Sequence, residues 1–138
     1  MNWHTSVRDV MSSTPVFVDI DDPPSRVQEV LSTHPFHHLP VLREGVLVGV
    51  VSVVDIARVS LGAYVTDEAT SSAWLDASFT VGEMMTWEPE TIRVSDPVKL
   101  AADKLSGGDF HCLPVVDGDD KLVGMLTSTD LLRWLVTA

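Results

Sequence analysis

Hydrophobic and polar positions along the first half of the chain follow the order of a β-α-β-β-α unit. Val27, Val30 and Leu31 share one face of a predicted helix. The run from Leu47 to Val51 does not alternate, which indicates a strand covered on both faces. In order, the pattern predicts a helical turn at 7–11, a strand at 16–18, a helix started by the N-cap Asp22 and Pro23, strands at 38–42 and 46–51, and a last helix over 53–61.

The second half of the chain repeats this pattern. Residues 7–58 realign on residues 81–133, with one extra residue near Asp119. Self-similarity at this period implies two copies of one supersecondary unit. The sequence therefore predicts an α/β fold with a small mixed sheet in each copy, packed about a pseudo-twofold axis with two related clefts. Identical positions include Met11/Met85, Pro15/Pro89, Asp22-Pro23/Asp96-Pro97, Phe36-His37/Phe110-His111, Leu39-Pro40-Val41/Leu113-Pro114-Val115, Leu47-Val48-Gly49/Leu122-Val123-Gly124, Asp55/Asp130 and Arg58/Arg133.

The domain boundaries follow from the repeat. We expect one copy over residues 1–61, a linker over 62–80 and the other copy over 81–138. The polar stretch 66–72 predicts a flexible linker, whereas Trp74, Leu75 and Phe79 could pack back onto the domain.

Composition and charge exclude several classes of protein. The chain has 138 residues, of which 45% are hydrophobic and 21% charged, as expected for a globular domain. No apolar run reaches the roughly 18 residues that a membrane span needs, and the first residues do not resemble a signal peptide. With Cys112 as the only cysteine, no intrachain disulfide can form, and a cytoplasmic location is expected. The net charge of −11 argues against nucleic acid and anionic membranes as partners.

The most specific local motif is duplicated, as Gly49 to Asp55 and Gly124 to Asp130. Glycine lets a ligand or another backbone approach the strand closely. The hydroxyl of Ser52 or Thr127 follows where strand becomes helix, a position that suits a phosphate. An aspartate one turn later can accept two hydrogen bonds, as a ribose diol requires. The alternative is a capping box, in which the same side chains only satisfy helix N–H groups.

These motifs resemble those of the cystathionine-β-synthase (CBS) domain, and the tandem resembles a CBS pair, or Bateman module. The resemblance covers nearly the whole chain outside the linker. It implies two β-α-β-β-α repeats that bind adenosyl ligands (AMP, ADP, ATP or S-adenosylmethionine) in clefts between the repeats. It also implies a homodimer formed through the CBS helices.

The resemblance assigns residues to each cleft, with the base against one repeat and the ribose-binding aspartate from the other. One cleft would use Ser12, Val16, Phe36, His37 and His38 for the base, with Thr127, Thr129 and Asp130 for ribose and phosphate. The mirror cleft would use Thr86, Phe110, His111 and Cys112, with Ser52 and Asp55.

Two departures concern the Asp55 cleft. Val54 replaces a polar residue that Thr129 keeps, and Glu90 stands where the first repeat has Val16. A carboxylate there would disfavour an anion, so we expect the Asp130 cleft to be better occupied. Arg58 or Arg133 could assist at the phosphate.

Other chemistry has weaker support. His37 and His38 would point to opposite faces of a strand, so we expect no metal site; His37 and His111 could instead cap the loop before the strand. Cys112 has the pattern of a buried apolar side chain. No nucleophile or general base stands out, so we expect no enzyme and no required cofactor. The leading hypothesis is a regulatory module that binds an adenosyl ligand and signals to an effector protein in trans; the alternative is a structural dimerisation module with empty clefts.

Overall fold

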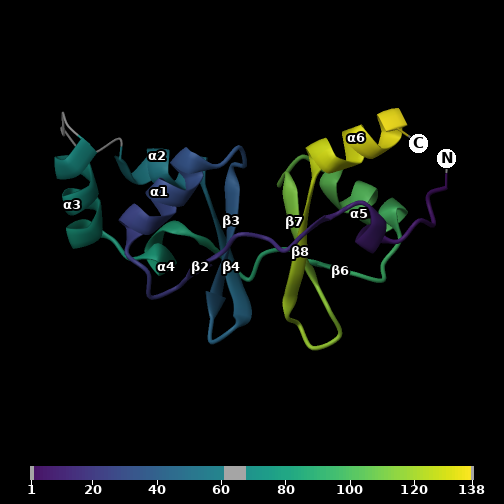
Figure 1. Ribbon diagram of the computed structural model, residues 1–138, viewed down its shortest axis with the longest axis horizontal. Helices are drawn as coiled ribbons and strands as arrows, with labels where there is room; N and C mark the ends of the chain where they lie inside the picture. The colour runs from purple at the N-terminus through teal and green to yellow at the C-terminus, as the bar shows by residue number, and fades with distance from the viewer. Residues whose placement is uncertain (1, 61–67, 138) are drawn as a thin grey trace. The chain divides into compact units, whose positions relative to one another are not determined.

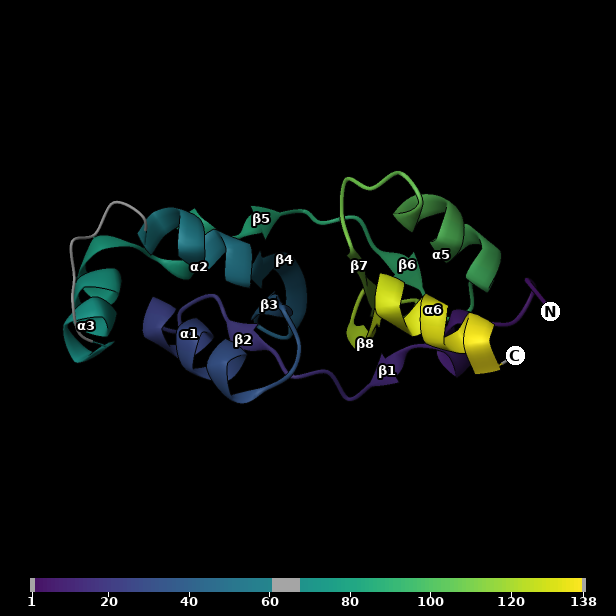
Figure 2. The same cartoon turned by 90° about the horizontal axis from the view of Figure 1, so that it is seen from above.

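The computed structural model describes residues 2–60 and 68–137, which form two compact units. Unit 1 comprises Met1–Pro15 with Pro89–Ala138, and unit 2 comprises Val16–Glu88. Each unit is a mixed sheet with helices against one face, as the β-α-β-β-α prediction requires (Figures 1 and 2). The predicted mixed α and β fold is confirmed.

Unit 2 has a sheet of order β2-β3-β4-β5, in which only the β2–β3 pair is parallel. Its core gathers Val27 of the first helix, Leu39 and Val51 of the central strands, and Leu75, all at most 1% exposed. The elements are β2 (Val18–Asp19), α1 (Pro24–Thr33), β3 (His38–Arg43), β4 (Val46–Ser52), α2 (Val53–Ser60), α3 (Glu68–Ser78), α4 (Val81–Met84) and β5 (Thr86–Trp87).

Unit 1 has the matching order β1-β8-β7-β6, with only the β6–β7 pair parallel. Val7 lies in its core beside Ile92, Leu113 and Leu126. The elements are η1 (Val7–Asp9), β1 (Ser12–Ser13), β6 (Ile92–Arg93), α5 (Val98–Leu105), β7 (Cys112–Val116), β8 (Leu122–Thr127) and α6 (Ser128–Thr137).

Each sheet takes its β1 or β5 edge strand from the other sequence repeat. β1 pairs antiparallel with β8 of the second repeat, and β5 pairs antiparallel with β4 of the first. Neither strand was predicted, because two polar or exposed residues carry no periodicity. The compact units therefore combine residues from both repeats.

The helix starts differ from the prediction in one respect. Pro23 and Pro97 are the N-cap residues of α1 and α5, with no side-chain cap. Asp22 and Asp96 instead accept the backbone N–H groups of Asp19 and Arg93, both at 2.9 Å. The prediction that the aspartates cap these helices is wrong because they close the preceding turn.

The predicted linker is partly helical. Its described portion begins at Glu68, the first residue of α3. Leu75 is 1% exposed, and Trp74 and Phe79 pack against the unit 2 core, with their rings edge to face at 5.7 Å. This segment is therefore part of unit 2; the rest of the predicted flexible stretch lies outside the described residues.

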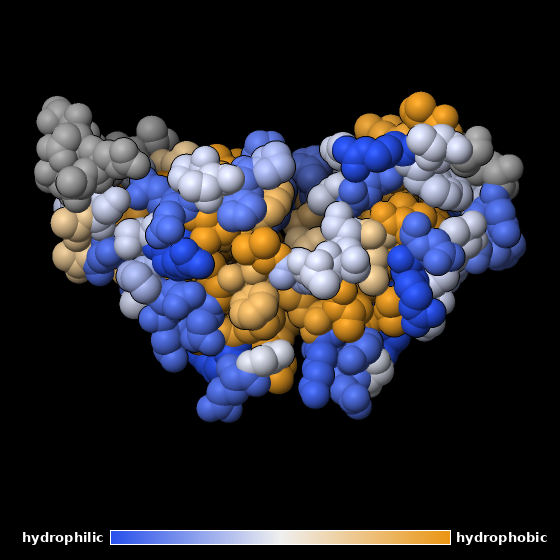
Figure 3. Space-filling model, viewed as in Figure 1, coloured by the Kyte–Doolittle hydropathy of each residue, from blue (hydrophilic) through white to orange (hydrophobic). Residues whose placement is uncertain are grey.

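The surface differs between hairpin tips and helices. Hydrophilic residues cover the ends of the β3–β4 and β7–β8 hairpins, whereas hydrophobic residues lie at the surface over α6 (Figure 3). On α6, Leu132 is 62% and Val136 85% exposed.

Candidate functional site

Each predicted aspartate sits at the start of the helix that follows a central strand. Asp55 lies in the first turn of α2, after β4, and Asp130 in the first turn of α6, after β8. Gly49 and Gly124, upstream of the two aspartates, each allow the backbone of a neighbouring strand to come close, whereas the sequence had also suggested a ligand. A Cβ at Gly49 would lie 2.8 Å from the Thr86 carbonyl oxygen, and a Cβ at Gly124 would lie 2.8 Å from that of Ser12.

The Asp55 carboxylate has donors on both oxygens. Oδ2 accepts the Ser52 N–H at 2.8 Å and the Ser52 hydroxyl at 3.0 Å, and the Asp55 N–H donates back to Ser52 Oγ at 3.2 Å. Oδ1 pairs with Arg58 Nη2 at 3.0 Å. Arg58 also donates to the Met84 carbonyl at 3.1 Å, so its guanidinium is held from two sides.

The Asp130 carboxylate has the same plan with fewer contacts. Oδ2 accepts the Thr127 N–H at 2.9 Å, and the Asp130 N–H donates to Thr127 Oγ1 at 3.0 Å. Oδ1 faces Arg133 Nη1 at 3.5 Å. The Arg133 side chain is 69% exposed, whereas that of Asp130 is 11% exposed.

The capping-box alternative therefore describes the local geometry of both motifs. In each, one carboxylate oxygen serves the helix start and the other faces an arginine one turn on. The next N–H groups are also occupied, because Val53 and Ser128 donate to the carbonyls of His37 and His111, both at 3.0 Å. Only the arginine-facing oxygen can change partners without leaving the backbone N–H of Ser52 or Thr127 unpaired.

Unit 1 brings together residues from both predicted clefts. Cys112 pairs with Thr127 across β7 and β8, and Ser12 pairs with Met125 across β1 and β8. The unit holds seven of the predicted residues: Ser12, Phe110, His111, Cys112, Thr127, Thr129 and Asp130. Cys112 is 6% exposed, and burial raises the pKa of its thiol to about 11. Its thiol is therefore neutral at physiological pH.

Unit 2 holds the other seven predicted residues: Val16, Phe36, His37, His38, Ser52, Asp55 and Thr86. His38 pairs with Ser52 across β3 and β4, and Thr86 pairs with Val50. Phe36 packs against the core and stacks on His34 at 4.9 Å between ring centroids. Part of its ring is therefore already engaged within the unit.

The two sequence departures differ in their surroundings. Glu90 forms an ion pair with Lys104 of α5, which offsets its charge. Val54 is 70% exposed on α2. The expected repulsion by Glu90 is therefore weaker than the sequence alone implied.

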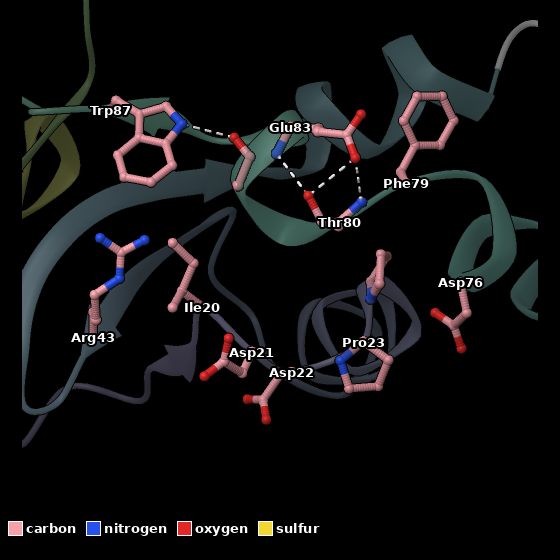
Figure 4. Close-up of a pocket in the computed structure, with 12 residues that line it drawn as sticks. Ile20, Asp21, Asp22, Pro23, Arg43, Asp76, Phe79, Thr80, Glu83 and Trp87 are labelled. Carbon is pink, nitrogen blue, oxygen red and sulfur yellow. Dashed lines mark hydrogen bonds between the residues drawn. The ribbon is translucent and has the colours of Figure 1, made fainter.

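A cavity of about 670 Å³ in unit 2 lies away from the predicted residues. It lies between the loop that carries Asp21 and Asp22 and the start of α4, where Thr80 and Glu83 form a capping box (Figure 4). Arg43 and Trp87 both line the cavity, and the guanidinium carbon of Arg43 lies over the Trp87 ring, 5.5 Å from the ring centroid. None of the predicted site residues lines this cavity. A smaller one of about 290 Å³ in unit 1 includes Arg93 and Lys104 in its lining, and again none of the predicted residues.

Within residues 2–60 and 68–137, no three His, Cys, Asp or Glu side chains gather as metal ligands would. None of the helices in this part of the chain is both long and apolar enough to cross a bilayer.

Solved structures match nearly the whole chain. CBSX2 from Arabidopsis thaliana, in its complex with AMP, superposes with a TM-score of 0.79 at 28% identity, covering 96% of each chain. The CBS domain pair of protein MJ0100, in complex with 5′-methylthioadenosine and S-adenosyl-L-methionine, also gives a TM-score of 0.79, at 29% identity and covering 96% of this chain and 97% of that one.

Among proteins of known sequence, the chain is 30% identical over 130 residues to L-aspartate semialdehyde sulfurtransferase of Methanocaldococcus jannaschii. It is 31% identical over 127 residues to homoserine O-acetyltransferase of Methanocorpusculum labreanum. The alignments cover 94% and 91% of this chain but only 23% of each relative. The model of the CBS domain matches residues 7–62 and 81–137, so the chain belongs to the CBS domain family.

Proposed function

We propose that this CBS pair is a regulatory module that binds AMP, ADP, ATP or S-adenosylmethionine and signals to a partner protein in trans. Support comes from the two similar structures, one in complex with AMP and one with S-adenosyl-L-methionine. The observation that carries the proposal is that Asp55 and Asp130 are nearly buried, and that one oxygen of each carboxylate faces a largely exposed arginine.

The ribose would bind at the arginine-facing oxygen. Its diol supplies two hydroxyl donors, and Oδ1 of Asp130 can accept one in place of Arg133. The Arg133 contact is 3.5 Å long and its side chain is largely in solvent, so it is readily exchanged. Oδ2 keeps its bond to the Thr127 N–H, and the helix start remains capped.

The displaced arginine then has a second use. A guanidinium that leaves the carboxylate is free to pair with a ligand phosphate, a strong charge-assisted contact. This supplies local positive charge in a chain of net charge −11. The same exchange at Asp55 is harder, because Arg58 would also leave the Met84 carbonyl. We therefore propose Asp130 as the tighter site.

Thermal unfolding with AMP, ATP and S-adenosylmethionine tests the proposal. A ligand at 100 times its dissociation constant adds about 2.7 kcal/mol to the free energy of unfolding. Asp130→Asn should remove most of that gain. The matched control is Asp103→Asn, an exposed carboxylate on α5 paired with Lys99, which should keep it. A melt unchanged by all three ligands would contradict the proposal.

A second comparison tests the role of Arg133. Arg133→Ala should weaken AMP binding by about tenfold while leaving adenosine binding unchanged or tighter, because adenosine has no phosphate. Isothermal titration of both ligands gives the two affinities. Equal losses for AMP and adenosine would show that Arg133 only supports the fold.

The structural dimerisation module remains the second candidate, because both carboxylates are satisfied without a ligand and α6 exposes Leu132 and Val136. In this case the chain should dimerise through its helices whether or not a nucleotide is present. Light scattering of the wild type and of Leu132→Glu, with and without AMP, separates the two. A dimer lost in the variant and indifferent to AMP favours the structural module.

A further inference from the structure

The opening segment, residues 2–15, completes the fold of unit 1. Val7 is fully buried in that core, and Met11 packs against it. β1 forms the edge of the sheet, with Ser12 opposite Met125 and Ser13 opposite Gly124. The segment therefore fills a groove whose other walls come from residues 89–138.

Backbone hydrogen bonds hold the segment along its length. The Val7 N–H donates to the Asp96 carbonyl at 2.8 Å. In return, the first N–H groups of α5 are satisfied by the segment, since Val98 donates to the Thr5 carbonyl at 2.8 Å and Lys99 to that of Trp3 at 3.1 Å. Without the segment, both the apolar groove and this helix start would lack partners.

The connection from this segment to unit 2 lies at the boundary between Pro15 and Val16. Just before it, Thr14 has φ of 50°. A β-branched residue in the left-handed region is strained. The closed position of the segment therefore depends on a strained connection.

We propose that the opening segment is an exchangeable strand, which can leave its own unit 1 and fill the same groove in a second copy of the chain. Every contact in the groove is kept, because the incoming residues are identical. Only the connection changes, and short strained connections favour this kind of exchange. Tethering favours the closed monomer at low protein concentration, so the exchanged dimer should increase with concentration.

The chain passes from one unit to the other a second time, between Glu88 and Pro89, and this connection provides a control. Glu88 has φ of 48° and precedes Pro89, as Thr14 precedes Pro15. The connection that has to reopen for the exchange is the one at Thr14, however, and Glu88 lies at the other boundary between the units. Relief of the strain at Glu88 should therefore leave exchange of the opening segment unchanged.

Two single-cysteine chains test the exchange, both with Cys112→Ala. One carries Ser12→Cys and the other Met125→Cys, positions that face each other across β1 and β8. Facing residues in an antiparallel pair lie within disulfide range. After co-refolding and oxidation, exchange predicts a disulfide between the two chains whose yield rises with protein concentration. A chain carrying both cysteines should close internally at low concentration.

Internal closure of the double variant with no disulfide between the single variants at any concentration would overturn the proposal. Thr14→Gly should lower the yield of linked dimer by about tenfold or more, while Glu88→Gly should leave it within twofold. Equal effects of the two glycine substitutions would also overturn it, because the strain at Thr14 would then have no special role.

Discussion

The two aspartate sites share a sequence motif but differ in how firmly the carboxylate is held. Asp55 receives both the N–H and the hydroxyl of Ser52, and its arginine is also bonded to Met84. Asp130 receives the Thr127 N–H on the same oxygen, and its arginine stands at 3.5 Å. The difference teaches that a repeated motif fixes where a carboxylate lies, while neighbouring elements decide how easily it exchanges partners.

The starts of α1 and α5, the helices that follow β2 and β6, also have different partners in the two units. In unit 2, both Asp76 oxygens of α3 bind Ser25 at the start of α1, at 2.7 Å from its N–H and 2.6 Å from its hydroxyl. In unit 1, backbone carbonyls of the opening segment serve the start of α5 instead. Two equivalent helix starts are thus satisfied by segments that have no sequence relation.

The largest expected effect concerns Gly49 and Gly124, and it tests whether the backbone packs against both glycines equally tightly. Gly49→Ala and Gly124→Ala should each lower the free energy of unfolding by about 3 kcal/mol, because each Cβ would meet a carbonyl oxygen at 2.8 Å. Urea denaturation measures both. Gly118→Ala is the control, since nothing lies within 4 Å of its Cβ. A loss at Gly124 no greater than that at Gly118 would show that β1 yields easily.

The next effect exploits Cys112, whose sequence counterpart in unit 2 is His38. Burial raises the thiol pKa from 9.0 to about 11, so the fold favours the neutral form. Its contribution to the free energy of unfolding, about 2.7 kcal/mol, is complete below about pH 9 and is lost as the pH rises toward 11. Unfolding at several pH values, compared with Cys112→Ala, isolates this loss. Parallel pH curves for the two proteins would contradict it.

A smaller effect distinguishes the hydroxyl caps that Ser52 and Thr127 provide at the starts of α2 and α6. Ser52→Ala should cost about 1.5 kcal/mol and Thr127→Ala about 1 kcal/mol, because the Ser52 hydroxyl makes one more hydrogen bond to its aspartate. Chemical denaturation gives both values, with Ser106→Ala on the surface of unit 1 as the reference. The reverse order would remove the basis for calling the Asp55 site more firmly held.

The smallest effect concerns the arginines. Arg58→Met should cost about 0.5 kcal/mol and Arg133→Met less, because both side chains are mostly exposed but only Arg58 has a second partner. Thermal unfolding at low and high salt resolves the pair contributions, which should shrink as salt rises. A larger loss for Arg133→Met than for Arg58→Met would indicate that the Asp130–Arg133 ion pair is the stronger of the two.

The sequence by itself determined the two copies, their central strands and the aspartates in the first turns of α2 and α6. These features depend on neighbours a few residues apart, so local periodicity and repetition reveal them. Only the tertiary structure decided that β1 pairs with β8 and β5 with β4, that Asp76 and the Trp3 carbonyl serve two helix starts, and that Arg58 reaches Met84. These choices join residues distant in sequence, and their free energies come from packing and hydrogen bonds that no local pattern encodes.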